Sequence, residues 1–525
     1  MLIDFRANRP EHPQSAETLV IGSGAVGLCL AVELARAGRQ VILLEAGGRS
    51  VDVASQQYFT NARWRDQRLP GLHLGRFRML GGTTNFWGGQ LVAFDPLVFE
   101  HRPWVADIAW PITRQELDPY YERGYELLGM AHHLSDEQIW ERLDVPRPEL
   151  GDALEFYFSA WTPEPNFAAL FAGEIRSSTR LFAFINAPVV ALELAESGDR
   201  VAGAVVRTPA GELRRFSGQR VILANGTMEI ARLLKLPLHD GRAAPWAGNP
   251  WLGKGFTDHI DCFGGQVTPL DKKRFHDLFD NAYLDGLKYA PKLKLSSRVQ
   301  IERQLFGVTA FFLFNSSLQE HLGNAKLFVR SLFRGNVRAL PNPLHLVASL
   351  RVAAPMIARY LRYRRIYNPV DQGIQLRLMG EQFPLPQSEL HLSDKCDQLG
   401  MPLVDIDWRI DGREIESLAI AAELVAQYLE REQIASVRLD AGLARRDPGL
   451  TAQFGDYYHQ MGMARMASSP AGGVVDRDLK VFGTRNLYVA GAAVYPTTGF
   501  ANPTFTAIAL ALRLADAIRS ERADC

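Results

Sequence analysis

The stretch Thr-Leu-Val-Ile-Gly-Ser-Gly-Ala-Val-Gly, residues 18–27, decides the fold of this 525-residue chain. Its apolar start predicts a buried strand, its glycines predict a tight turn, and the apolar run from Ala25 to about Ala37 predicts a helix. A second predicted strand, 40–44, ends at Glu45. In such a βαβ unit, the glycine turn lets a pyrophosphate approach the helix N-terminus, and the acid accepts from a ribose hydroxyl. The stretch therefore predicts dinucleotide binding; the alternative is a chance glycine turn.

The composition is that of an ordinary globular protein. Hydrophobic residues make up 47% of the chain and charged residues 22%, and 58 basic residues balance 58 acidic ones. A formal net charge of zero gives no general attraction for nucleic acid, so we expect no nucleic-acid partner. The length exceeds what a single core serves, so we expect two or more structural units.

The cysteines point to a reducing compartment. No two of them have the CxxC spacing of a zinc or dithiol site, so we expect neither a metal site nor a disulfide framework. Residues 1–17 show no basic start followed by an apolar run, which is what a signal peptide requires. We therefore expect a cytoplasmic location. The four cysteines are Cys29, Cys262, Cys396 and Cys525.

Two further stretches fit a dinucleotide site. Residues 78–89, Arg-Met-Leu-Gly-Gly-Thr-Thr-Asn-Phe-Trp-Gly-Gly, are too rich in glycine for a helix or a regular strand and predict a loop that lies close to a flat group. Strands and turns between 187 and 225 end in a buried strand at 221–224. Asn225-Gly226-Thr227 then opens another helix, which predicts a second backbone approach to the dinucleotide.

Residues 266–450 differ in character and are predicted to bind the substrate. Alternating apolar residues predict strands at 388–392 and 404–408, and an amphipathic helix follows from Ile415 to Leu429. We expect a sheet backed by this helix.

A basic segment, 321–370, interrupts this region. It holds nine lysines and arginines and no Asp or Glu. Arg351, Pro355 and Arg359 break its apolar stretch, so we do not expect it to span a bilayer. A basic helical segment of this kind can contact an anionic membrane, dock a partner or receive an anionic substrate, and the plain alternative is a solvated face whose charges are paired.

Together with the C-terminal stretch Tyr457–Ile518, these motifs resemble the glucose-methanol-choline (GMC) family of FAD-dependent alcohol oxidoreductases over almost the whole chain. The resemblance implies an α/β fold (α+β overall) with two domains. The first is a Rossmann-like FAD-binding domain that is discontinuous in sequence, formed by 16–115, 180–265 and 451–525. The second is an antiparallel-sheet substrate domain backed by helices, formed by 116–179 and 266–450.

The resemblance also implies site residues. Its cofactor contacts fall in the motifs and beside them, at Gly22, Gly24, Ala25, Val26, Gly27, Glu45, Ala46, Gly81, Gly82, Thr83, Asn85, Phe86, Trp87, Val190, Ala224, Gly226, Ala490, Gly491, Pro503 and Thr504. Members that attach the flavin covalently near this loop carry histidine where this chain has Phe86, and phenylalanine cannot form that bond. We therefore expect non-covalent FAD. Many members also carry aspartate near the ribityl chain where Ala490-Gly491 stands, which leaves that contact open.

His459 aligns with the family's catalytic base and Asn502 with its second active-site position. An imidazole can take the hydroxyl proton while hydride leaves the alcohol carbon, and an amide can hold the substrate oxygen. The alternatives are a hydrogen-bonded core histidine and an N-cap for the helix that starts at Pro503. His259 lies in a turn that the family uses for cofactor contacts.

The expected reaction is oxidation of an alcohol to a carbonyl, on a sugar, glycoside or polyol. The electron acceptor is O2, a quinone-like molecule or a protein. Two alternatives stay open, namely an apolar or lipid-linked alcohol at a membrane surface reached through 321–370, and a non-redox lyase that keeps FAD for structure. A flavin-binding scaffold without catalysis is a third.

Overall fold

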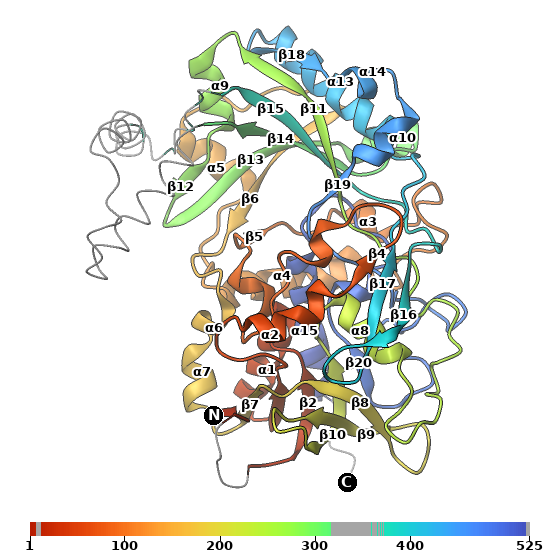
Figure 1. Cartoon of the computed structure of the whole chain (residues 1–525). Helices are drawn as coiled ribbons and strands as arrows, with labels where there is room; N and C mark the ends of the chain where they lie inside the picture. The colour runs from red at the N-terminus through yellow and green to blue at the C-terminus, as the bar shows by residue number, and fades with distance from the viewer. Residues whose placement is uncertain are drawn as a thin grey trace, which may run out of the picture.

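The computed structural model describes residues 1–6, 12–316, 359, 365, 368, 370 and 372–520. Two large sheets lie one above the other, with helices around them (Figure 1). The expected fold class is confirmed, because the lower sheet is largely parallel and the upper one antiparallel. Within these residues, no helix has both the length and the apolar composition needed to cross a membrane.

The lower sheet is built from widely separated parts of the chain. Its strand order is β1-β7-β3-β2-β10-β9-β8, and β20 also pairs with β10. The first half of β10 is antiparallel to β9, and its second half is parallel to both β2 and β20. The bounds are β1 Leu2–Asp4, β2 Ser15–Ile21, β3 Val41–Leu44, β7 Leu181–Ile185, β8 Val189–Leu194, β9 Val201–Arg207, β10 Leu213–Leu223 and β20 Leu487–Val489.

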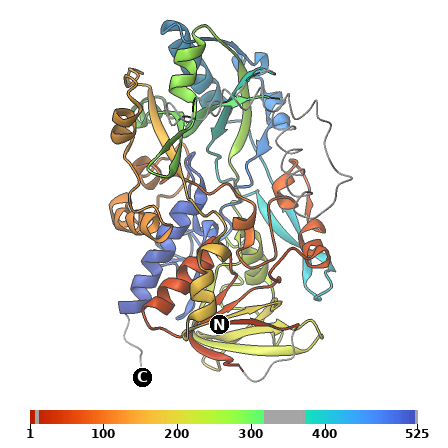
Figure 2. The ribbon, with the colours of Figure 1, turned by 90° about the vertical axis from the view of Figure 1, so that its left-hand side faces the viewer.

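Helices cover this sheet. The predicted helix after residue 24 is α1, Ala25–Arg36, and the one after Gly226 is α8, Thr227–Lys235. The long helix α15, Pro503–Ser520, packs against α1 and α4, and Figure 2 shows α1 and α15 side by side. The other helices of this half are α2 Val53–Thr60, α3 Pro96–Phe99, α4 Arg114–Leu127, α6 Phe167–Leu170 and α7 Ala172–Ser177, with short 3-10 helices η1 Pro70–Leu72, η2 Gly82–Asn85 and η5 Ala492–Val494.

The upper sheet has the strand order β18-β11-β15-β14-β13-β6-β5, with β12 paired to β13 and β19 to β11. All of its pairs are antiparallel, and a separate apolar core joins it to the amphipathic helix α13, Ile415–Arg431. The strands are β5 Gln90–Leu91, β6 Leu154–Trp161, β11 Ile260–Pro269, β12 Ala282–Leu284, β13 Leu287–Leu295, β14 Val308–Phe314, β15 Ile374–Gly380, β18 Ala435–Leu439 and β19 Gly455–Asp456. The remaining helices are α5 Asp136–Leu143, α9 Lys272–Phe279, α10 Ser297–Arg303, α14 Ala441–Ala444 and η4 Pro448–Gln453.

One expectation about the sheets is wrong. The strands predicted at 388–392 and 404–408 exist as β16, Glu389–Cys396, and β17, Pro402–Asp407, but α13 does not back them. They form a small sheet with β4, Arg63–Trp64, and β16 packs against α8. Alternation in a sequence shows that a strand has a buried face but does not identify the partner. The two-domain division stays a prediction, and β11 runs across its boundary at residue 265.

The basic segment 321–370 lies almost entirely outside the described residues. Two of its arginines are described, and both contact the end of α9 and the turn that follows it. Arg359 pairs with Asp277 at 2.8 Å and Asp280 at 3.2 Å, and Arg365 donates to main-chain carbonyls of the same turn.

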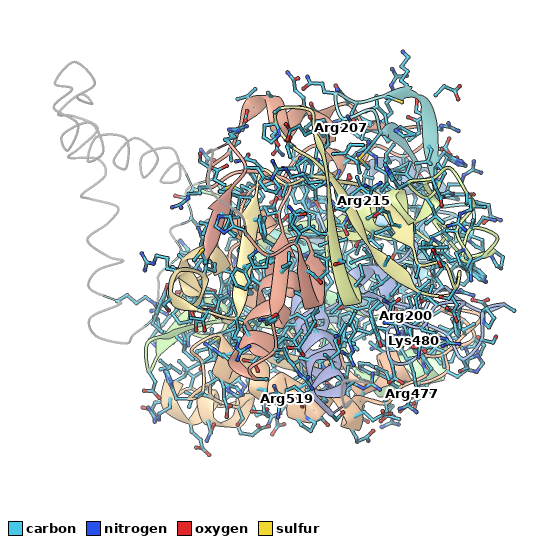
Figure 3. All side chains as sticks on the ribbon, turned by 90° about the horizontal axis from the view of Figure 1, so that it is seen from below. Arg200, Arg207, Arg215, Arg477, Lys480 and Arg519 are labelled. Atoms are coloured by element: carbon cyan, nitrogen blue, oxygen red, sulfur yellow. The ribbon has the colours of Figure 1, made fainter. Side chains whose placement is uncertain are left out.

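A second group of basic residues is seen when the molecule is viewed from below (Figure 3). Four of the six labelled residues there are paired with acids, so their charges are largely neutralised within the protein. These four are Arg215, Arg477, Lys480 and Arg519.

Candidate active site

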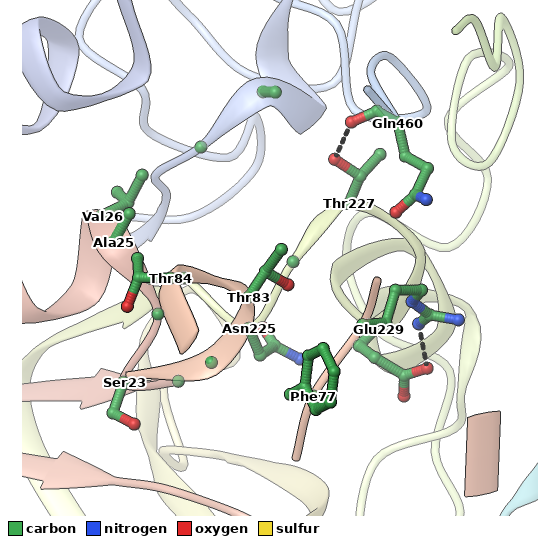
Figure 4. A pocket seen from close by; sticks show the side chains of 18 of the residues that line it. Ser23, Ala25, Val26, Phe77, Thr83, Thr84, Asn225, Thr227, Glu229 and Gln460 are labelled. Atoms are coloured by element: carbon green, nitrogen blue, oxygen red, sulfur yellow. Dashed lines mark hydrogen bonds and ion pairs between the residues drawn. The ribbon is translucent and has the colours of Figure 1, made fainter. Parts of the chain in front are cut away.

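A cavity of about 450 Å³ opens at the carboxyl ends of β2, β3, β10 and β20. Ligands of open α/β sheets bind at this edge because the turns after the strands meet there. Side chains from 23–26, 83–84 and 225–229 converge on the cavity (Figure 4). Most of the predicted site residues line it, namely Gly22, Gly24, Ala25, Val26, Glu45, Ala46, Gly82, Thr83, Phe86, Trp87, Ala224, Gly226, His459, Ala490, Gly491, Asn502, Pro503 and Thr504.

The first glycine turn has the close packing that its sequence predicts. Gly22 has φ 100°, a left-handed conformation that favours glycine, and a Cβ on Gly27 would lie 1.9 Å from the Gly22 carbonyl oxygen. Glu45 closes the other side of the turn. Its carboxylate accepts from the Ser23 hydroxyl at 2.6 Å and from the amides of Ser23 and Gly47, and burial raises its pKa.

The cavity has the features that FAD requires. A Cβ at Gly24, Gly226 or Gly491 would meet nothing within 4 Å, so three backbone segments leave room for a ligand to come close. The buried Asn225 Oδ1, which lines the cavity, has no hydrogen-bond partner among the described residues. The residues present therefore fit a dinucleotide with its pyrophosphate at the N-terminus of α1.

Four predicted cofactor residues do not line the cavity. Gly27 and Gly81 serve the backbone, since Gly81 has φ 90° and a Cβ there would meet the Asn85 amide at 2.8 Å. Asn85 braces the loop by donating to the carbonyls of residues 80 and 82. The neighbouring Val189 lines the cavity in place of Val190. A β-bulge between Val189 and Ala191 breaks the simple alternation of side chains in that strand.

Arginines that the sequence analysis did not single out line the same cavity. Arg76 and Arg232 both pair with Glu229, at 3.1 and 3.2 Å. Arg78 is buried over the ring of Tyr58 and pairs with no acid in the described part of the chain, and burial lowers its pKa. A buried guanidinium of this kind suits a diphosphate. In the sequence, the position of Arg78 at the start of the predicted loop 78–89 was the feature that could have indicated a place at the site.

His459, Asn502 and His259 form a chain of side chains at the other end of the site. Nδ1 of His459 lies 2.8 Å from Nδ1 of His259, and Nε2 of His459 lies 3.2 Å from the Asn502 amide nitrogen. His259 in turn places its Nε2 2.9 Å from the Gly499 carbonyl oxygen. Sequence reasoning placed His259 near the cofactor but did not predict this contact between residues 200 positions apart.

These contacts set the tautomers of both rings. A carbonyl oxygen only accepts, so His259 donates from Nε2 to Gly499 and, as a neutral ring, accepts at Nδ1. His459 therefore donates from Nδ1 and keeps a lone pair on Nε2, beside Asn502. Burial, and then the neighbouring His259, hold the pKa of His459 well below 6.5, and burial lowers that of His259 to about 4. The arrangement presents a neutral imidazole base to the cavity.

The side chain of Asn502 does not cap the helix α15. Its amide nitrogen faces His459, and its Oδ1 is buried without a partner among the described residues, so it accepts no bond from the first turn of α15. An amide in this position can hold an oxygen beside the histidine.

A buried ion pair fixes the turn that carries Gly499. Arg102 makes two 2.8 Å bonds to Glu381, with both side chains at most 1% exposed. Glu381 also accepts from the amides of Gly499 at 2.8 Å and Gly307 at 3.1 Å. Burial raises the pKa of Glu381, but Arg102 and these amides outweigh it and the net shift is downward. The buried Arg102–Glu381 ion pair therefore fixes Gly499, whose carbonyl accepts the hydrogen bond from His259.

Comparison with known proteins agrees with this site. Residues 384–511 match a family model described as GMC oxidoreductase, and 17–254 match one described as FAD dependent oxidoreductase. Paromamine 6'-oxidase of Streptomyces fradiae is 23% identical, over 96% of this chain and 91% of that protein. 2-Methyl-1,2-propanediol dehydrogenase of Mycolicibacterium austroafricanum is 22% identical, over 97% and 96%. The solved structure of formate oxidase has a TM-score of 0.59 at 16% identity, covering 98% of this chain and 100% of that one.

Proposed function

Because the chain belongs to the GMC family of FAD-dependent alcohol oxidoreductases, we propose that it oxidises an alcohol of a sugar, glycoside or polyol, with His459 as the base and Asn502 holding the substrate oxygen. The observation that carries the proposal is the lone pair of a neutral His459 Nε2, 3.2 Å from the Asn502 amide nitrogen, inside the cavity that fits the cofactor. Two of the relatives are named for oxidation of paromamine and of 6'''-hydroxyparomomycin C, which supports a carbohydrate-like substrate.

His459 and Asn502 have different roles in this proposal: one accepts the proton and the other holds the substrate oxygen. His459 takes the hydroxyl proton at Nε2 while His259 keeps the opposite nitrogen protonated, so the ring does not turn or change tautomer. Asn502 donates to the substrate oxygen and holds it beside the base. Bound FAD supplies the acceptor for the hydride that leaves the alcohol carbon. The positive end of α15 adds a favourable field for negative charge at this place.

Anaerobic reduction of the flavin tests this proposal. Purified protein is mixed without oxygen with sugars, glycosides, polyols and simple alcohols, and absorbance of the oxidised flavin is followed. We expect bleaching by at least one carbohydrate hydroxyl compound, and admission of air then shows whether O2 accepts the electrons or a quinone-like or protein acceptor is needed. A complete lack of bleaching by any alcohol would contradict the proposal and favour the lyase alternative.

The state of FAD attachment gives a second prediction. Phe86 lies at the cavity, with the ring centroids of Phe77 and Tyr458 5.6 and 6.4 Å from its own, and a phenylalanine ring cannot form the covalent flavin bond that a histidine could form. We expect acid or heat precipitation to release all of the FAD into the supernatant, measured by its absorbance. Flavin fluorescence that stays with the protein band on a denaturing gel would refute this.

The proposed location is the cytoplasm. The three described cysteines, Cys29, Cys262 and Cys396, are free thiols, which suits a reducing compartment.

A further inference from the structure

Lys292 lies on the face of the upper sheet that is turned toward the cavity. In the pairing of β13 with β6, Lys288 is opposite Trp161 and Lys292 is opposite Tyr157. Directly paired residues share one face of an antiparallel sheet, and so do residues an even number of positions apart in one strand. Trp161 lines the cavity. Lys292 therefore shares its face of the sheet with Trp161, although it is not itself one of the residues that line the cavity.

Two aromatic rings connect the ammonium group of Lys292 to the proposed base. Its Nζ lies 5.0 Å from the centroid of the Phe311 ring. Phe311 contacts Tyr457 with ring centroids 6.4 Å apart, and Tyr457 stacks on His459 at 6.1 Å. The charge of Lys292 contributes, after burial and His259, to the lowered pKa of His459. A substrate held at His459 thus comes within the field of this lysine.

Lys292 has no counter-charge in the described residues. It is only 8% exposed, and no described acid pairs with its Nζ. Lys294, two positions further on the same face, shows the usual arrangement, with Asp95 at 2.8 Å and Glu155 at 3.3 Å. Burying an ammonium group without a partner is costly, and burial lowers the pKa of Lys292 to about 8. Buried ionisable groups with strongly shifted pKa values are enriched at functional sites, where a ligand can supply the missing partner.

We propose that Lys292 binds an anionic substituent of the substrate, so that the alcohol oxidised here carries a carboxylate or a phosphate. This rests on the proposed function, since it assigns the substrate class of the same site. Lys288 supports it with a second positive charge on this face, held 3.7 Å over the Trp161 ring and likewise without an acidic partner among the described residues. Two cations on one face favour an anionic alcohol and disfavour one that carries an amine.

The test compares alcohols that differ in one substituent. Full-length, FAD-loaded enzyme is assayed for kcat/KM with D-glucuronate, D-glucose 6-phosphate, D-glucose and D-glucosamine. We expect an anionic sugar to exceed glucose by about tenfold or more and glucosamine to be the poorest. The substitution Lys292→Met should lower kcat/KM for the anionic sugar roughly 10- to 150-fold, which is the effect of one charged hydrogen bond, and leave glucose within about twofold. Lys292→Arg should keep most of the preference.

Two readouts separate substrate binding from a structural role. Removal of an unpaired buried charge should leave the melting temperature of Lys292→Met equal to or above that of the wild type, whereas loss of a structural lysine would lower it. Titration with inorganic phosphate or acetate should perturb the flavin absorbance of the wild type and not that of Lys292→Met. The stronger of the two anions identifies which substituent the site prefers.

The outcomes also distinguish this inference from the proposed function. If no alcohol bleaches the flavin, the proposed function fails. If alcohols bleach it but anionic and neutral ones react alike, this inference alone is overturned. It is also overturned if Lys292→Met slows both equally, because Lys292 would then act on the base and not on the substrate.

Discussion

Replacement of His459 by alanine slows anaerobic flavin reduction by the preferred alcohol about 10²- to 10⁴-fold, which is the usual contribution of a positioned base. The effect should fall on the rate constant of reduction more than on substrate binding, because Asn502 and the cavity wall remain. Stopped-flow absorbance of the oxidised flavin measures it. The structural reason is that the His259 contact leaves His459 Nε2 as a lone pair beside Asn502.

His132→Ala provides the matched control. His132 is exposed, forms a hydrogen bond with the carbonyl of Asp285 and does not line the cavity, so its loss should change neither the reduction rate nor the FAD content. FAD content of His459→Ala must equal that of the wild type for the comparison to hold. Full reduction rates in His459→Ala would show that another group takes the proton.

The pH dependence of the wild type follows from the same histidine. The neutral imidazole is the active base and exists above its pKa, which burial and His259 hold well below 6.5. The neutral fraction is therefore complete at neutral pH, so the reduction rate should be flat between about pH 6.5 and pH 8 and fall only at lower pH. A rate that doubles between pH 6.5 and pH 8 would show that His459 keeps an ordinary histidine pKa, and a steeper rise would show that another group is the base.

Replacement of Arg102 by methionine has the largest expected effect on stability, a loss of about 3–5 kcal/mol in the free energy of unfolding. The reason is that Glu381 would remain as a buried carboxylate without its two 2.8 Å bonds to the guanidinium. Urea unfolding followed by tryptophan fluorescence measures the change. Because Glu381 also binds the Gly499 amide, the variant should lose reduction rate as well.

Arg298→Met is the control for this substitution. Arg298 forms ion pairs with Asp152 and Glu302 while 61% exposed, and exposed pairs contribute about 0–1 kcal/mol. Similar losses in the two variants would mean that the buried pair has no special role in holding the turn of Gly499.

The local motifs were predictable because each is set by neighbouring residues. Strand, glycine turn, helix and acid at 18–45 depend on contacts within one βαβ unit, and the structure has them as β2, α1 and β3. The pairing of β17 with β4, which places β16 and β17 in a separate small sheet, was not predictable, because burial alternates in the same way whichever sheet a strand joins.

The site shows the same limit at the level of single residues. The positions of His459 and Asn502 at one cavity agree with the family resemblance, yet the His259 contact that fixes the tautomer joins residues far apart in sequence. Val189 lines the cavity and the predicted Val190 does not, beside a β-bulge that the sequence did not reveal. Lys292 could be identified as a candidate anion-binding residue only from the structure. The reason is that the argument rests on its burial without an acidic partner among the described residues.

The lower sheet can be completed only late in synthesis, because its strand β10 pairs with strands from both ends of the chain. One part of it pairs with β2, made early, and the same part pairs with β20, which leaves the ribosome after every strand of the upper sheet. Contacts of such long sequence separation form slowly. This edge of β10 therefore stays unpaired until β20 has been synthesised. The cavity that fits FAD is complete only after that, because residues 490–492 and 502–504 also line it. Supply of FAD during expression should accordingly govern how much active protein is recovered.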